Sequence, residues 1–228
     1  MTAILTHTPA ETALIEALEG ATGWRAQLRE ATRKDGLPTR RHELWKWSDL
    51  RRAANDISAP GELSVSGLAG LASAADGDRI ELTVTASPGA SAGDAALVIP
   101  AGASVTLVER LCGETGALGN WHLDITIEAG ARLDRIVVAD HHEDAVFVGS
   151  AEITLHEDAS LNQTMVDTGA RLSRNETHIH HPGQGASVAL GGAYILGAGR
   201  HADSTTVVHH TGPCCQTRPL VKGAVASG

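Results

Sequence analysis

Ala101-Gly102-Ala103-Ser104-Val105 is the stretch that decides the fold, because versions of it return three more times along the chain. The later copies are Ala129-Gly130-Ala131-Arg132-Leu133, Glu157-Asp158-Ala159-Ser160-Leu161 and Gln184-Gly185-Ala186-Ser187-Val188. Counted on the central alanine, the intervals are 28, 28 and 27 residues. A fixed period in this range indicates one supersecondary unit per repeat, which buries its apolar face by stacking on its neighbours.

A second, offset series of β-rich segments keeps the same spacing. It comprises residues 123–127, 151–155, 179–181 and 207–209. Each period therefore holds two short strands separated by Gly, Asp and Asn turn signals, which predicts a mainly β protein built as a flattened parallel β-helix. A jelly roll is the alternative, but its tight hairpins favour Asn-Gly or Asp-Gly pairs, and these occur only at residues 35–36 and 76–77.

The repeats also predict which side chains face inward. Val105, Leu133, Leu161 and Val188 follow the repeated alanine and should form one interior column. In the second series we align Ile179 with Val207 at an interval of 28 residues, as Ile125 aligns with Ile153.

The chain divides into three parts by pattern. Residues 1–54 carry apolar side chains at three-to-four-residue steps and form an N-terminal α-helical cap, which would shield the open edges of the first turn. Residues 55–88 are rich in Gly, Ser and Ala and are expected to be a transition or linker. Residues 89–228 form the β-helix core.

Composition limits the function classes. The 228 residues carry a net charge of −9 without any block of Lys and Arg, which argues against nucleic-acid and membrane-surface partners. We find no signal-peptide pattern and no apolar run of membrane-spanning length. The three cysteines are Cys112, Cys214 and Cys215, an odd number that fits a reducing compartment, so we expect a cytoplasmic protein.

Histidines are the candidate ligands. By strand parity His181 and His209 should point inward on neighbouring turns, whereas His178, His180 and His210 should point outward. With a thiolate from Cys214 or Cys215, the inward pair could bind zinc, iron or copper. The alternative is a hydrogen-bonded histidine ladder, and we expect this structural role, with no metal bound stoichiometrically.

Other polar clusters are weaker candidates for a functional site. Asp140-His141-His142-Glu143-Asp144 is a possible metal site that we expect to be an exposed turn. Together with Asp134, its acids could serve a β-helical carbohydrate-active enzyme of the polysaccharide lyase or hydrolase type, although only 3% of residues are aromatic. Trp24, Trp45 and Trp47 are expected to pack helices. No nucleophile elbow or phosphate-binding loop is present.

Two motifs carry a resemblance to a known family. The first runs from Gly36-Leu37-Pro38 to Glu43-Leu44-Trp45-Lys46-Trp47-Ser48-Asp49-Leu50, and the second joins Gly199-Arg200-His201-Ala202-Asp203 to Val208-His209-His210 and Lys222-Gly223. Together they resemble the SufB/SufD family, with SufD as the nearer branch. Trp47 and Ser48 stand where the family more often has Tyr and Thr.

The resemblance implies a right-handed parallel β-helix that acts with SufB and the ATPase SufC in iron–sulfur cluster assembly. It implies a scaffold and not an enzyme, with a cluster held only transiently in the complex. Family members continue beyond the Lys-Gly, so we expect this chain to be truncated at its C-terminus and to self-associate through an uncovered last turn.

Overall fold

The structure is a computed structural model, which describes residues 6–226. Residues 1–5 of the expected helical region and residues 227–228 of the expected core lie outside the described part. The N-terminal elements are α1 (Pro9–Ala17), α2 (Gly23–Asp35), a 3₁₀ turn (Glu43–Trp45), α3 (Leu50–Ala53), β1 (Leu63–Ser66) and α4 (Leu68–Ala72). The repeats form β2 (Arg79–Ala86), β3 (Gly89–Ile99), β4 (Ser104–Gly113), β5 (Ala117–Ile127), β6 (Arg132–Ala139), β7 (Val146–Leu155), β8 (Ser160–Asp167), β9 (Leu172–His181), β10 (Ser187–Leu196), β11 (Ala202–His210) and β12 (Gln216–Val225).

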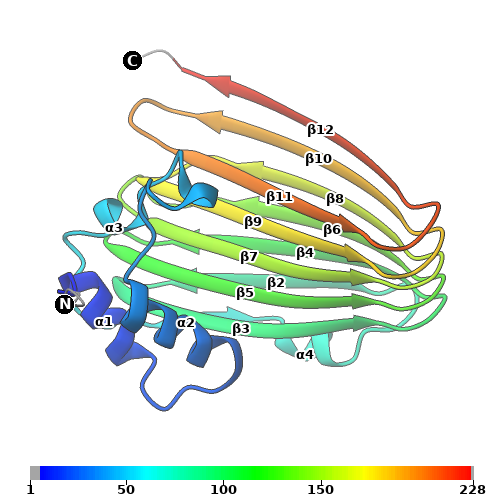
Figure 1. The fold of residues 1–228 in the computed structure, drawn as a ribbon, viewed down its shortest axis with the longest axis horizontal. Helices are drawn as coiled ribbons and strands as arrows, with labels where there is room; N and C mark the ends of the chain where they lie inside the picture. Colours follow the sequence, from blue (N-terminus) through cyan, green and yellow to red (C-terminus); the bar gives the residue numbers. More distant parts are fainter. Residues whose placement is uncertain (1–5, 227–228) are drawn as a thin grey trace.

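The strands form a parallel solenoid of about five turns. The even-numbered strands and β1 make a seven-stranded sheet in the order β1-β2-β4-β6-β8-β10-β12, and the remaining odd-numbered strands make a five-stranded sheet, β11-β9-β7-β5-β3. Every named strand pair is parallel except β1 with β2. Figure 1 shows the arrows of each sheet from β2 onward pointing the same way. The predicted β-helix is therefore confirmed over the jelly roll, which needs antiparallel neighbours.

The recurring Ala-Gly-Ala pattern marks one corner of the solenoid. Its middle residue has a left-handed backbone in all four copies, with φ of 70° at Gly102, 67° at Gly130, 53° at Asp158 and 73° at Gly185. Glycine adopts this conformation without steric cost, and Asp is among the few other residues that tolerate it. The repeated sequence therefore reflects the backbone conformation that each corner requires. The alanine that follows the left-handed residue is buried in each copy.

The predicted interior column is confirmed. Val105 pairs with Leu133, Leu133 with Leu161, and Leu161 with Val188 in successive parallel registers. All four side chains are at most 3% exposed and belong to the apolar core between the two sheets. Because strand side chains alternate, this register places every second residue of β2 and β6 in the core.

The predicted alignment of the last odd strands is wrong by one residue. Ile179 pairs with Val208, an interval of 29, and not with Val207. The paired positions explain why: the chain needs eight residues from Tyr194 to Ala202 but only six for the equivalent path on the preceding turn. The longer corner shifts the rest of β11 relative to β9.

The N-terminal region covers more than the first turn. Apolar residues of α1 and α3, among them Leu14 and Leu50, join a second core cluster with Leu118, Val146 and Leu172 at the starts of successive odd strands. In Figure 1 the segment from α2 to α3 rises along that side of the five-stranded sheet. The expectation of a cap confined to the first turn is corrected, because the strand starts themselves present an apolar surface that needs covering.

The first turn is closed by α4 and β1, which lie in the segment that we expected to be a linker. Leu71 of α4 is 4% exposed and belongs to the solenoid core, and Gly70 lies against Ile80 of β2. Residues 55–88 therefore contain β1, α4 and β2, and the parallel ladder begins at β2 and not at residue 89.

A charged pair lies inside the core. Arg135 donates through Nε and Nη2 to Glu109 Oε2 at 3.0 and 2.7 Å. The same carboxylate accepts a hydrogen bond from Trp121 Nε1 at 2.8 Å, and Arg135 Nη1 donates to Gln163 Oε1 at 2.8 Å. All four residues are at most 6% exposed. Buried charges persist when they are paired and hydrogen-bonded in this way.

Truncation of the interior column should destabilise the solenoid. Leu133→Ala removes a fully buried side chain and should lower the free energy of unfolding by about 2–5 kcal/mol through cavity formation. Ile195→Ala, at a side chain that is 62% exposed, is the matched control and should change it by less than about 0.5 kcal/mol. Urea unfolding measures both, and equal effects of the two variants would contradict the interior placement.

Removal of one partner of the buried pair should cost more than removal of both. Arg135→Met leaves the Glu109 carboxylate buried without its cation and should lower the free energy of unfolding by about 3–5 kcal/mol. The double variant Glu109→Leu/Arg135→Met removes the stranded charge and should recover a large part of this loss. A double variant less stable than Arg135→Met would show that the pair is not coupled as described.

Candidate metal centre

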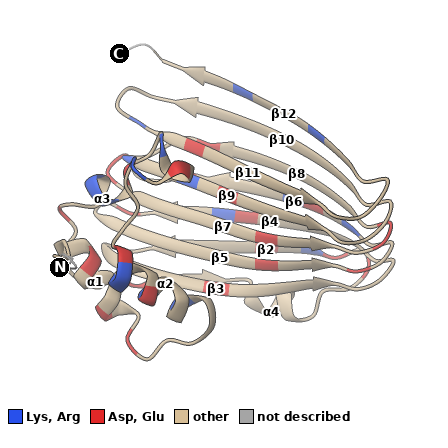
Figure 2. Ribbon diagram, viewed as in Figure 1, with Lys and Arg blue, Asp and Glu red and all other residues tan. Residues whose placement is uncertain are grey.

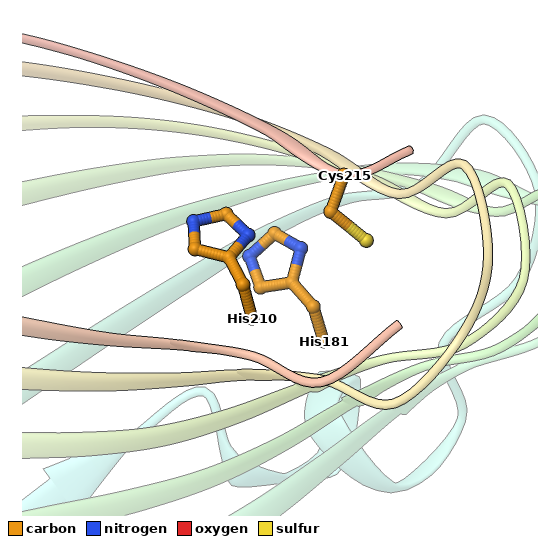
Figure 3. A group of neighbouring side chains, drawn as sticks. All are labelled: His181, His210 and Cys215. Carbon is orange, nitrogen blue, oxygen red and sulfur yellow. The ribbon is translucent and has the colours of Figure 1, made fainter. Parts of the chain in front are cut away.

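Three potential metal ligands meet at the corner that joins β11 to β12. His181 is the last residue of β9 and His210 the last of β11, and they pair in register on adjacent parallel strands. Cys215 lies just before β12. Figure 3 shows the two imidazole rings side by side, with the Cys215 side chain next to the His181 ring. The left-handed backbone at Cys214, with φ of 60°, turns the chain at this corner.

The donor atoms of this group are close together. One nitrogen from each histidine and Cys215 Sγ all lie within 4.8 Å of one another, and the ring centroids are 4.7 Å apart. Cys215 Sγ donates to the Gly183 carbonyl oxygen at 3.3 Å, and Thr217 Oγ1 lies 3.2 Å from His210 Nε2.

His181 is the buried member of the group. Its side chain is 0% exposed, and neither ring nitrogen has a hydrogen-bond partner among the described residues. Burial lowers the pKa of His181 below 6.5, and the neighbouring His210 lowers it further. The imidazole is therefore neutral at pH 7, which leaves one nitrogen lone pair available as a ligand.

Two of the four candidate residues from the sequence lie at this centre. His181 and Cys215 are present, but His209 points to the other face, where it stacks on His180 with ring centroids 4.8 Å apart. Cys214 is exposed. The structure places His210 where we expected His209, because the β11 register is 29 residues and not 28. The 27-residue interval between Ala159 and Ala186 was the sequence signal that the later corners are irregular.

The acidic turn at residues 140–144 is exposed as expected, with one exception. His141 is 3% exposed, stacks on Phe147 with ring centroids 4.6 Å apart, and has no hydrogen bond to either ring nitrogen in the described chain. Burial lowers the pKa of His141 to about 4; Asp140 opposes the shift and Arg200 reinforces it. The expectation of a wholly exposed turn is corrected, since this ring is a buried, uncharged part of the core.

Two of the acids expected for a carbohydrate enzyme lie beside arginines. Asp134 pairs with Arg132 at 2.9 Å, and Asp144 lies 3.8 Å from Arg171. Figure 2 shows acidic and basic residues interspersed over the strands and corners.

A cavity of about 660 Å³ lies between α2 and the outer face of the five-stranded sheet. Two of the three tryptophans of the N-terminal region line it: Trp24 stacks on His122 with ring centroids 4.8 Å apart, and Trp45 lies beneath the Arg174 guanidinium at 4.1 Å. Both make the packing contacts that the sequence predicted. Trp47 does not, since it is 73% exposed.

Arg174 ties the N-terminal region to the late strands. This arginine is 1% exposed, donates to the Leu44 carbonyl oxygen at 2.6 Å, and forms ion pairs with Glu176 and Asp203. Ser48 adds hydrogen bonds to His201 and Asp203. The 3₁₀ turn is therefore held on β9 and β11, which leaves the Trp47 ring on the surface.

Among residues 6–226 there is no helix long and apolar enough to cross a membrane.

Comparison with known proteins identifies related sequences. Residues 82–228 match the family model described as SUF system FeS cluster assembly, SufBD core domain. An iron–sulfur cluster assembly SufBD family protein of Mycobacterium leprae is 31% identical over 104 residues, 46% of this chain and 26% of that protein. Proteins of the same description from Mycobacterium bovis and Mycobacterium tuberculosis are 27% identical over 124 residues, 54% of this chain and 30% of theirs.

These alignments span less than a third of the length of each of these relatives. No solved structure matches the chain significantly.

The burial of His141 predicts an acid-sensitive fold. The unfolded chain takes up a proton near pH 6.5, whereas the folded chain resists protonation of His141 until about pH 4. His141 therefore makes its full contribution to the free energy of unfolding above pH 6.5. This contribution falls by about 3 kcal/mol in all as the pH drops toward 4.

His141→Leu removes this titration, so its unfolding free energy should decline less between pH 7 and pH 4.5 than that of the parent. The exposed neighbour provides the control: His142→Gln should keep the parental pH dependence. Urea unfolding at several pH values measures the slopes, and parallel slopes for parent and His141→Leu would refute the assignment.

Proposed function

We propose that this chain, which belongs to the SufBD core domain family of the SUF system for iron–sulfur cluster assembly, serves that system as a non-enzymatic scaffold subunit. The observation that carries the proposal is the extent of the family match, which runs from β2 through every later strand of the solenoid. In this role the cluster is cargo, and the protein contributes surfaces that hold other subunits.

The partners that we propose are SufB-like and SufC-like subunits, with this chain in the SufD-like position. The motif from residues 36 to 50 supports that position, because it resembles the SufD branch. The three free cysteines support a reducing, cytoplasmic setting for the complex.

The contact surface that we propose includes Leu44 and Trp47. Both are large apolar side chains, 60% and 73% exposed, on a turn held by the Arg174 and Ser48 contacts. An exposed tryptophan on a fixed backbone provides contact area at small entropic cost, and tryptophan is enriched at the energetically dominant positions of interfaces. The carbohydrate-active alternative has no comparable support, since two of its candidate acids, Asp134 and Asp144, lie beside arginines.

Co-expression with the SufB-like and SufC-like proteins of the same genome tests the proposal. We expect the three chains to co-purify at a fixed ratio through affinity and size-exclusion steps. Trp47→Ala should weaken retention of the partners, whereas Val98→Ala, which alters a side chain 52% exposed on β3, should not. Far-UV circular dichroism of each variant establishes that the fold is intact.

Purification of this chain alone from the co-expressing cells would overturn the scaffold role. Equal loss of partners in Trp47→Ala and Val98→Ala would instead overturn the proposed surface while leaving the role intact.

A further inference from the structure

We propose that His181, His210 and Cys215 form a binding site for one divalent metal ion of the borderline-soft class that includes Zn²⁺ and Fe²⁺. The inference goes beyond the scaffold role and does not depend on it. It also replaces our expectation from the sequence that no metal binds stoichiometrically. Strand parity had placed His210 on the outer face, but the register in the structure brings it next to His181.

The state of the His181 ring is the first argument. A polar group that is buried without a hydrogen-bond partner is unfavourable relative to a satisfied one. Other buried polar side chains in the solenoid interior, such as Arg135 and Gln163, are hydrogen-bonded. A bound metal ion would satisfy one His181 nitrogen where the described protein atoms do not.

The other ligand side chains near the His181 ring also favour a metal site. His141 is also buried without a partner, yet it stacks on Phe147 and belongs to no group of ligands. Among residues 6–226, the group of three ligand side chains within mutual reach is the one formed by His181, His210 and Cys215. Figure 3 shows that all three side chains extend into the same space between the strands.

The donor set selects the class of metal. Two imidazole nitrogens and one thiolate suit zinc and ferrous iron, whereas magnesium and calcium prefer oxygen ligands. Metal–nitrogen bonds of about 2.0 Å and metal–sulfur bonds of about 2.3 Å separate the ligand atoms of a tetrahedral site by about 3.3–3.7 Å. The donors, now within 4.8 Å, need to approach by about 1 Å.

The two outer ligands provide that movement. His210 is exposed and Cys215 lies in the corner before β12, whereas His181 is fixed by the core. On binding, the Cys215 thiol releases its proton to solvent and gives up its hydrogen bond to the Gly183 carbonyl in exchange for the metal–sulfur bond. Thr217, 3.2 Å from His210 Nε2, orients that ring. Three protein ligands leave a fourth position open to water or another ligand.

Cobalt titration tests the site directly. The full chain is reduced, stripped of metal and titrated anaerobically with Co²⁺, which substitutes for zinc and reports its ligands by absorption. We expect one Co²⁺ per chain, with a thiolate-to-cobalt charge-transfer band and the intense d–d bands of four-coordinate cobalt.

Paired variants separate the site from its neighbours. Cys215→Ser should abolish the charge-transfer band, and His210→Ala should weaken Co²⁺ binding by about tenfold or more. Cys214→Ser and His209→Ala are the matched controls, each one residue away, and should bind as the parent does. These four positions lie at the corner or the strand end, so the test does not rest on truncation of the buried His181; circular dichroism checks each fold.

Competition identifies the ion. Displacement of Co²⁺ by stoichiometric Zn²⁺ or by excess Fe²⁺ supports the site and shows which ion it prefers. Displacement by millimolar Mg²⁺ would overturn the donor assignment. The proposal also fails if the parent shows no charge-transfer band, if the band survives Cys215→Ser, or if Cys214→Ser and His209→Ala lose binding to the same extent.

Discussion

The constraint on which this structure depends is the parallel register between successive turns. Each strand must return its apolar side chains to the column occupied by the preceding turn, and a slip of one residue would send them to the opposite face. The corners enforce this return. The left-handed residue at Gly102, Gly130, Asp158 and Gly185 keeps the path between strands constant on one edge of the solenoid. Where corner length varies, as between β10 and β11, the register varies with it.

The same constraint explains how far the sequence could predict the structure. The column through Val105, Leu133, Leu161 and Val188 was predictable, because identical corners repeat at 27 or 28 residues. The pairing of His181 with His210 was not predicted, because the parity argument assumed a constant interval, whereas the corner between β10 and β11 is longer than the equivalent one before it. Of the three side chains that meet at this corner, His181 and Cys215 were among the residues singled out from the sequence, and His210 lies one position beyond His209.

Other features escaped prediction because they depend on tertiary contacts. Nothing local distinguishes His141, inside a run of charged residues, as a buried ring that stacks on Phe147. Glu109 and Arg135 are 26 residues apart in sequence and meet only because adjacent turns stack. The helical pattern of the first 54 residues was visible, but its placement along the odd strands follows from the apolar strand starts at Leu118, Val146 and Leu172.

The contacts of the N-terminal turn have a consequence for the order of folding. A solenoid allows nearest-neighbour growth, in which each turn adds to the one already formed as the chain leaves the ribosome. Ser48, however, is hydrogen-bonded to His201 and Asp203, more than 150 residues later in the chain. The segment synthesised first must therefore wait, undocked at this point, until β11 has formed. Among these side-chain hydrogen bonds, the contacts of greatest sequence separation therefore form late, after the turns between them have been laid down.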